Sequence, residues 1–81
     1  MKAIIYSKPD CQGCQATKRQ CLKLSVTYEE RQIDDHPQVK QSLQEMNWTM
    51  MPYVQITDET GNNLDHWNGF KPERLKNWAN Q

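Results

Sequence analysis

The sequence predicts one α/β domain spanning residues 1–81, with elements in the order β-α-β-α-β-β-α and a four-stranded mixed sheet flanked by helices. An apolar, partly β-branched run at residues 2–6 is followed by a loop and a helix-forming segment. A strand-helix-strand unit of this kind pairs its strands in parallel across the helix. A turn-rich segment at residues 58–63 then joins two short strands into an antiparallel hairpin.

Two strands and two helices are expected in the first half of the chain. Residues 2–6 are expected to form a buried strand, and residues 26–33 alternate imperfectly as a second strand. Between them, residues 12–24 are good helix formers without proline. Acidic residues before a proline at residues 34–37 indicate the start of a second helix. The residues expected along the inner faces of these helices are Cys14, Thr17, Lys18, Cys21, Leu22, Val39, Leu43 and Met46.

The second half of the chain is expected to supply two strands and a last helix. Residues 53–57 form the third strand, and residues 63–67 follow the turn as the fourth. Gly69 breaks the chain after it. Residues 71–74 then open a helix, because proline suits its first turn. Leu75 and Trp78 are expected on the inner face of that helix.

Composition excludes several classes of protein. Ten basic and ten acidic residues balance, so no charge excess indicates nucleic acid or an anionic membrane as a partner. The longest apolar run, residues 3–6, is far shorter than the roughly 20 residues of a membrane span. Met1-Lys2 leads into that run without the layout of a signal peptide. We therefore expect a soluble, cytoplasmic protein whose thiols are kept reduced.

Two of the three cysteines, Cys11 and Cys14, form a C-x-x-C pair that a metal or a redox reaction could use. A closed zinc site needs four ligands, and this pair supplies two. Cys21 lies about two helical turns beyond Cys14, too far along the axis to share one ion easily. His36 and His66 show no matching ligand spacing. A C-x-x-C between a strand and a helix in a reduced compartment is typical of thioredoxin-like redox proteins.

The expected helix start favours Cys11 as the nucleophile. Its sulfur lies where the first helical N–H groups and the positive end of the helix dipole stabilise a thiolate, which is the attacking species. Lys8 adds positive charge nearby. Cys14, one turn further on, is placed to attack the mixed disulfide and release the substrate. Asp10 opposes this arrangement, since a carboxylate beside Cys11 disfavours the thiolate unless it points away or caps the helix.

Four segments are shared with one known family. They are C-Q-G-C after the first strand, Ala16-Thr17-Lys18-Arg19, Met51-Pro52 before the third strand, and Trp67-Asn68-Gly69-Phe70-Lys71-Pro72. Over nearly its whole length, the chain thus resembles a glutaredoxin-like electron carrier of the NrdH-redoxin type, within the thioredoxin fold. Asn68 departs from the serine usual in that family, and Tyr53 departs from its more aliphatic surroundings.

The resemblance implies both partners and partner-binding residues. Family members carry electrons to a class Ib ribonucleotide reductase and are re-reduced by thioredoxin reductase. A cis peptide at Met51-Pro52 is expected to face the cysteines and expose backbone to a substrate strand. The segment from Trp67 to Pro72 lies near the active site and replaces the acidic glutathione-binding turn of ordinary glutaredoxins. The expected partner-binding residues are Lys8, Met51, Pro52, Trp67, Gly69, Phe70 and Lys71.

The sequence therefore predicts a monomeric dithiol-disulfide carrier with no bound cofactor beyond a redox-active Cys11–Cys14 disulfide. A glutathione-dependent glutaredoxin is the alternative within the same chemistry. A module that binds zinc or an iron–sulfur cluster is the alternative from another class. Cys21 is expected to be a small buried hydrophobe, and Trp67 and Phe70 serve either the core or partner docking.

Overall fold

The computed structural model describes residues 1–80, which form a mixed four-stranded sheet with three α-helices and one short 3₁₀ helix. The predicted order of strands and helices is confirmed, and the 3₁₀ helix η1 is an addition to it. The elements are β1 (Lys2–Ser7), α1 (Gln12–Lys23), β2 (Tyr28–Gln32), η1 (Ile33–Asp35), α2 (Pro37–Glu45), β3 (Tyr53–Thr57), β4 (Asn63–Asn68) and α3 (Pro72–Ala79).

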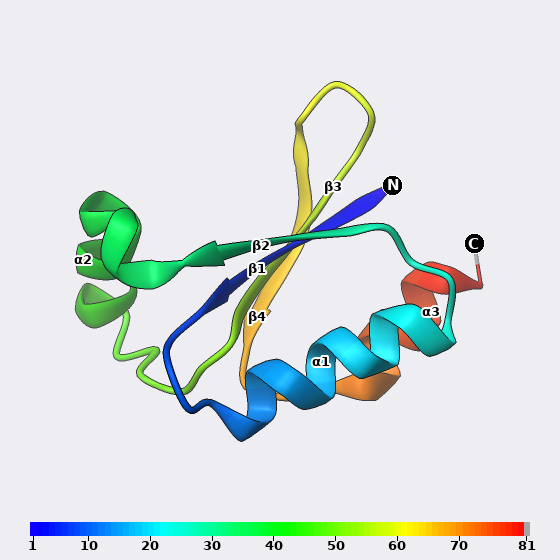
Figure 1. Cartoon of the computed structure of the whole chain (residues 1–81). Helices are drawn as coiled ribbons and strands as arrows, with labels where there is room; N and C mark the ends of the chain where they lie inside the picture. Colours follow the sequence, from blue (N-terminus) through cyan, green and yellow to red (C-terminus); the bar gives the residue numbers. More distant parts are fainter. Residues whose placement is uncertain (81) are drawn as a thin grey trace.

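The sheet has the strand order β2-β1-β3-β4, so β1 and β3 lie in its centre (Figure 1). β1 pairs with β2 in parallel through the α1 crossover, with Ala3 opposite Tyr28. β1 pairs with β3 antiparallel, with Ala3 opposite Ile56, and the β3–β4 hairpin completes the sheet. The carboxyl end of β1 and the amino end of β3 therefore meet at one end of the sheet, beside the start of α1.

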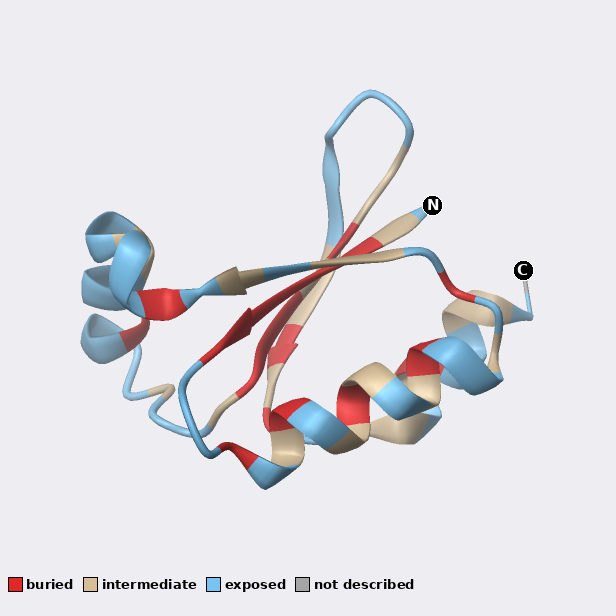
Figure 2. Cartoon of the chain, viewed as in Figure 1, coloured by how far each residue is buried: buried red, intermediate tan, exposed pale blue. Residues whose placement is uncertain are grey.

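One face of the sheet carries the larger core. α1 and α3 lie together along this face, and α2 lies at one end of the sheet (Figure 1). Buried residues gather in the central strands and along α1 (Figure 2), and Leu75 is the buried residue of α3. Burial of this apolar surface supplies the main driving force for folding. The buried members of this cluster are Ala3, Ile5, Cys21, Val26, Val54, Ile56, Trp67 and Leu75.

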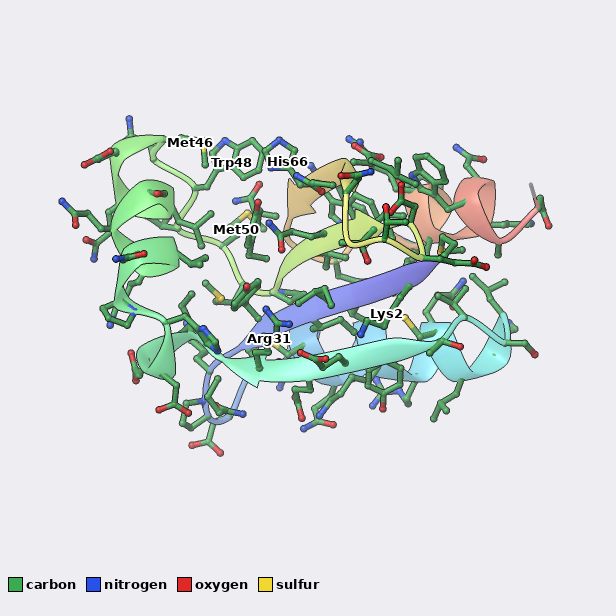
Figure 3. The ribbon with its side chains drawn as sticks, turned by 90° about the horizontal axis from the view of Figure 1, so that it is seen from above. Lys2, Arg31, Met46, Trp48, Met50 and His66 are labelled. Carbon is green, nitrogen blue, oxygen red and sulfur yellow. A yellow bond between two sulfur atoms is a disulfide. The ribbon has the colours of Figure 1, made fainter. Side chains whose placement is uncertain are left out.

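The other face combines a smaller aromatic cluster with polar side chains. Ile4, Tyr6 and Tyr53 point to this side and pack with Ile33 and Leu43. The Tyr6 and Tyr53 rings stack with their centroids 5.7 Å apart. Figure 3 looks onto this face and shows Lys2 and Arg31 over strands that no helix covers. β1 is buried on both faces, which agrees with the continuous apolar run at its residues 3–6.

The edge strand β2 is shorter than predicted. Its outer residues, 26 and 33, belong to the two clusters instead, since Val26 is buried beside α1 and Ile33 begins η1. The strand itself is charged: Glu29 pairs with Lys2 and Arg31, while Glu30 pairs with Lys18 at 2.8 Å.

The helices match their predicted positions, but two inner-face predictions were wrong. Leu22 is 70% exposed, and Met46 lies just beyond α2 and is also exposed. In α1 the buried residues are Cys14, Thr17 and Cys21, a narrower stripe than expected. Leu75 is buried and Trp78 packs against the main cluster, as predicted. Within residues 1–80, every helix is too short or too polar to span a membrane.

Candidate active site

Cys11 and Cys14 form a disulfide at the start of α1, with their Cα atoms 5.2 Å apart. β1 ends at Ser7, a short loop follows, and Cys11 occupies the N-cap position of the helix. Its backbone is extended, with φ −98° and ψ 108°, as an N-cap requires. The predicted position of the pair, between a buried strand and a helix, is confirmed.

The Cys11 sulfur performs the capping itself. The backbone N–H of Cys14 donates a hydrogen bond to Cys11 Sγ at 3.1 Å. This N–H is one of the groups that a helix start leaves without an intrahelical acceptor. When the disulfide is reduced, the same N–H and the positive end of the helix dipole favour a negatively charged sulfur at this position.

The two cysteines are both buried, to different extents. Cys11 is 7% exposed and Cys14 is 1% exposed. Cys11 is therefore the more accessible residue of the pair. Asp10 adopts φ 58° and, with Cys11, Gln12 and Gln15, lines a hollow at the surface. Of the two roles left open for Asp10, the N-cap position of α1 is taken by Cys11.

The loop before β3 packs directly on the first turn of α1. The Met51–Pro52 peptide bond is cis, as predicted, and Pro52 is buried. A Cβ added to Gly13 would lie 3.0 Å from the Met51 carbonyl oxygen and 3.4 Å from Pro52 Cδ. Gly13 thus allows a close backbone approach, a role the sequence analysis missed. The available signal was a glycine inside a helix, where it is destabilising by about 0.5–1 kcal/mol relative to alanine.

A second glycine connects this loop to the end of β4. Gly69 has φ +83°, and its backbone N–H donates a hydrogen bond to the Pro52 carbonyl oxygen at 2.8 Å. A Cβ at this position would lie 3.2 Å from Met50 Cε. The segment from residue 67 to residue 72 therefore contacts the loop that packs on the redox turn, although Gly69 follows Pro52 by 17 positions in the sequence.

The two aromatic residues of this segment differ in burial. Trp67 is 1% exposed in the main core, with the Arg74 guanidinium 5.0 Å from its ring centroid. Phe70 is 43% exposed and Met50 is 65% exposed. Trp67 is a core residue, whereas Phe70 and Met50 present apolar surface near the disulfide. Lys71 follows as the N-cap of α3 and is partly exposed.

Lys8 lies in the loop between β1 and Cys11. Its side chain is exposed and lines a cavity together with Met51. Among residues 1–80, Lys8 forms no ion pair. Of the predicted partner-binding residues, Lys8, Met51, Pro52, Gly69 and Phe70 lie around the redox end of the sheet, whereas Trp67 supports that end from the core.

Cys21 and the two histidines have structural positions. Cys21 is fully buried, and burial raises the pKa of its thiol to about 11, so it stays protonated. The His36 and Tyr6 rings form a T-shaped pair, and His66 Nδ1 is hydrogen-bonded to the Tyr53 hydroxyl at 2.9 Å. In the described part of the chain, no three His, Cys, Asp or Glu side chains converge as ligands for a metal.

Comparisons with known proteins agree with this geometry. The glutaredoxin family model matches residues 3–60. The glutaredoxin-like protein NrdH of Escherichia coli (strain K12) is 28% identical over 75 residues, covering 93% of this chain and 85% of that protein. NrdH of Lactococcus lactis is 25% identical over 75 residues, covering 93% of this chain and 96% of that protein.

Among solved structures, NrdH-redoxin from Escherichia coli superposes with a TM-score of 0.76 at 27% identity, covering 95% of this chain and 93% of that one. That protein is described as glutaredoxin-like with a thioredoxin-like activity profile. The predicted thioredoxin-like fold and the resemblance to NrdH-type redoxins are confirmed.

Proposed function

The chain belongs to the glutaredoxin family, and from that premise we propose that it is a cytoplasmic electron carrier that reduces a protein disulfide in a class Ib ribonucleotide reductase and is itself reduced by thioredoxin reductase. As an NrdH-like thiol-disulfide oxidoreductase, it exchanges two electrons through Cys11 and Cys14. The observation that carries the proposal is the Cys11–Cys14 disulfide at the N-terminus of α1.

The first step is the attack of the Cys11 thiolate on one sulfur of the client disulfide. A mixed disulfide forms between Cys11 and the client, and the other client sulfur leaves as a thiolate that takes a proton from solvent. The greater accessibility of Cys11 compared with Cys14 and the hydrogen bond from the Cys14 N–H support this role for Cys11. The helix start stabilises the attacking thiolate and so raises its population.

The second step releases the client. The Cys14 thiol loses its proton, and the resulting thiolate attacks Cys11 Sγ. The Cys11–Cys14 disulfide forms, and the second client sulfur leaves as a thiolate that becomes protonated. The carrier has then lost two electrons and the client has gained them. The sheltered position of Cys14 supports its role as the resolving cysteine, because only a sulfur bound to Cys11 comes within its reach.

The partner surface of this proposal surrounds the disulfide. An extended client segment would pair with the backbone at Met51, as peptides do when they add to an exposed strand. Exposed Phe70 and Met50 supply apolar contact on the neighbouring loops, and apolar side chains of this kind are enriched in protein interfaces. The segment Asn68-Gly69-Phe70-Lys71 offers no acidic residue to bind the glutathione amine, which favours thioredoxin reductase as the electron source.

The test compares two reducing systems with the same disulfide substrate. NADPH consumption is followed with this protein and thioredoxin reductase, and in parallel with glutathione and glutathione reductase. Turnover only with thioredoxin reductase is expected. Turnover only through glutathione would overturn the proposed electron source and identify a glutathione-dependent glutaredoxin. The Cys14→Ser variant, incubated with the ribonucleotide reductase, is expected to accumulate a mixed disulfide through Cys11, and its absence would count against this client.

A further inference from the structure

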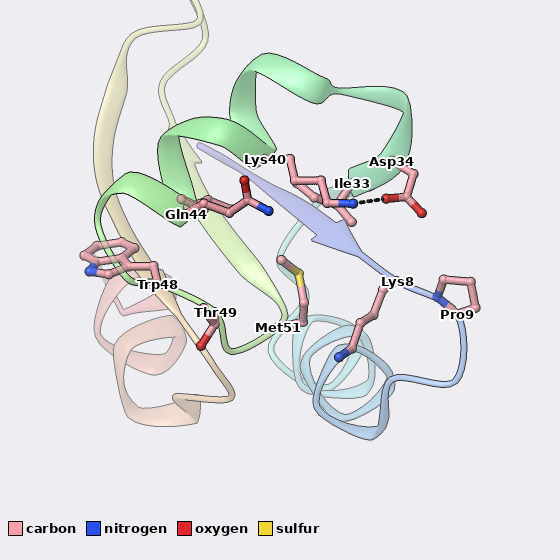
Figure 4. A pocket seen from close by; sticks show the side chains of 10 residues that line it. Lys8, Pro9, Ile33, Asp34, Lys40, Gln44, Trp48, Thr49 and Met51 are labelled. Atoms are coloured by element: carbon pink, nitrogen blue, oxygen red, sulfur yellow. Dashed lines mark hydrogen bonds and ion pairs between the residues drawn. The ribbon is translucent and has the colours of Figure 1, made fainter.

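A cavity of about 400 Å³ lies beside the active-site loop, on the α2 side of the sheet (Figure 4). Three segments that are distant in the sequence form it: the loop after β1, η1 with α2, and the segment before the cis proline. Its volume is within the range of sites that bind small molecules or single side chains. The chemistry described above uses Met51 and Lys8 at its border but gives the cavity itself no occupant.

The floor of the cavity is apolar and its rim is polar. Ile33 and Leu43 are buried, and Trp48 and Met51 are partly buried against the same cluster. Lys8, Lys40, Gln44 and Thr49 are exposed on the rim. Such an arrangement suits an apolar side chain with a polar or charged neighbour, because the floor excludes water while the rim stays solvated.

The charges on the rim do not balance. Lys40 Nζ is paired with Asp34 at 2.7 Å, so these two charges compensate each other. Lys8 has no ion-pair partner in the part of the chain that the structure describes. Figure 4 shows Lys8 extending beside Met51, across the cavity from Lys40 and Gln44 on α2. The cavity therefore presents one uncompensated positive charge above an apolar floor.

The cavity adjoins the proposed client-binding surface at Met51. Met51 both lines the cavity and provides the carbonyl oxygen that meets Gly13 in the redox turn. Lys8 precedes Cys11 by three residues. A client segment extended along Met51, with its cysteine at Cys11, would therefore bring a residue close to its own cysteine to the mouth of the cavity.

We propose that this cavity binds an apolar side chain of the client segment, the size of leucine or phenylalanine, while Lys8 pairs with an acidic residue next to it. This inference rests on the proposed function and adds sequence selectivity to it. The carrier would then distinguish clients by the residues around the disulfide, in addition to the disulfide itself.

The test uses symmetric peptide dimers, each joined by one disulfide. Two sets of four peptides are used. In each set the two residues beside the cysteine are Leu-Glu, Leu-Lys, Ser-Glu or Ser-Lys. These two residues precede the cysteine in the first set and follow it in the second. The second-order rate constant for reduction by the reduced protein is measured for each, relative to bis(hydroxyethyl) disulfide. The Leu-Glu peptide of one set is expected to react about tenfold faster than its Ser-Lys counterpart, in line with the transfer free energy of one such side chain.

Two variants separate the charge from the apolar floor. Lys8→Glu is expected to reverse the preference, so that the Leu-Lys peptide reacts faster than the Leu-Glu peptide. Gln44→Trp fills the mouth of the cavity from the exposed face of α2 and is expected to abolish the preference for leucine over serine. Lys23→Glu, at the opposite end of α1, is the matched control and should preserve the order of the four peptides.

Three results would overturn the inference. Rate constants within twofold of one another for all four peptides, with the protein client still reduced, would exclude the cavity as a client subsite and leave the proposed function standing. Competition by oxidised or reduced glutathione that disappears in Lys8→Glu would make the cavity a glutathione site. Failure with all peptides and with thioredoxin reductase would remove the proposed function and this inference together.

Discussion

The two ends of the sheet are held together in different ways. At the redox end, backbone groups contact backbone groups: the Gly69 N–H donates to the Pro52 carbonyl oxygen at 2.8 Å, and Gly13 meets the Met51 carbonyl oxygen. Met50 and Phe70, on the same two segments, are exposed.

At the hairpin end, one side chain holds the turn. The Asp58 carboxylate accepts hydrogen bonds from the backbone N–H groups of Thr60 and Asn62, both at 2.9 Å, and from their side chains. The hydrogen bond from the Thr60 hydroxyl is the main cause that lowers the pKa of this carboxyl. The turn satisfies its own polar groups. Substitutions at the redox end should thus change activity, and substitutions at the hairpin end should change only stability.

The largest expected effect is that of Cys11→Ser at the redox end. This variant has no attacking thiolate, so we expect NADPH turnover with thioredoxin reductase and a disulfide substrate to be lost completely. Cys21→Ala is the matched control, because Cys21 is buried and protonated. It should retain turnover and lose about 1 kcal/mol of stability through the small cavity it creates. Substantial activity in Cys11→Ser would show that another group is the nucleophile.

Gly13→Ala and Gly61→Ala compare a glycine at each end. The Gly13 substitution forces the Met51 carbonyl away, and we expect about a tenfold loss of kcat/KM, since misplacement by 1 Å can reduce a rate by up to about 10²-fold. Stability should change little, because alanine favours the helix. Gly61 has φ +90° with open space around it, so alanine there should destabilise the fold by about 1–2 kcal/mol at unchanged kcat/KM. Equal activity losses would contradict the distinction between the two ends.

Asp65→Ala tests the strand that connects the two ends. Asp65 accepts hydrogen bonds from Arg74 and from Trp78 Nε1, the latter at 2.9 Å, and so holds α3 to β4. Burial alone raises the pKa of this carboxyl, but the hydrogen bonds outweigh burial and the net pKa is lowered. We expect a loss of about 1–2 kcal/mol at pH 7 in urea unfolding.

The Asp65 carboxyl also makes the stability difference between wild type and variant depend on pH. Its contribution to stability is complete above the ordinary aspartate pKa of about 3.9 and is lost as the pH falls through the lower folded-state pKa. The difference between wild type and Asp65→Ala should therefore shrink in acid. A difference that stays constant from pH 7 to acid would show that the ionised carboxylate is not the stabilising group.

The smallest expected effect is that of Asp58→Ala at the hairpin end. The variant loses the hydrogen bonds that close the turn, and its urea midpoint should fall slightly. Turnover with thioredoxin reductase should equal that of the wild type. A reduced turnover without a change in the urea midpoint would mean that the hairpin takes part in partner contact.

Elements and site residues were predicted correctly where the local sequence pattern and the residue chemistry indicate the same structure. The strand at residues 53–57 has the predicted bounds, and Cys11 and Cys14 lie at the helix start as expected. Predictions of burial were wrong where the exposure of a side chain depends on how much of its helix the sheet covers. Leu22 fits an inner stripe by spacing, but the stripe that contacts the core is narrower.

The local pattern of the sequence also did not predict contacts between distant segments. Trp67 and Phe70 are three residues apart and equally aromatic, yet only the packing of β4 against α3 decides that one is buried and the other exposed. The approach of Gly13 to Met51 joins residues 38 positions apart, as numbered in the sequence. No local residue spacing predicts a contact between residues so far apart in the sequence, because the order of the strands in the sheet brings them together.

The charged edge strand β2 also affects how copies of the protein behave toward one another. An edge strand exposes unpaired N–H and C=O groups that could pair with another molecule and begin aggregation. β2 carries Glu29, Glu30 and Arg31 on three consecutive positions, and these charges are held in place by ion pairs. Bringing two such edges together would desolvate these charges and oppose like ones. β2 therefore disfavours edge-to-edge strand pairing between copies of the protein.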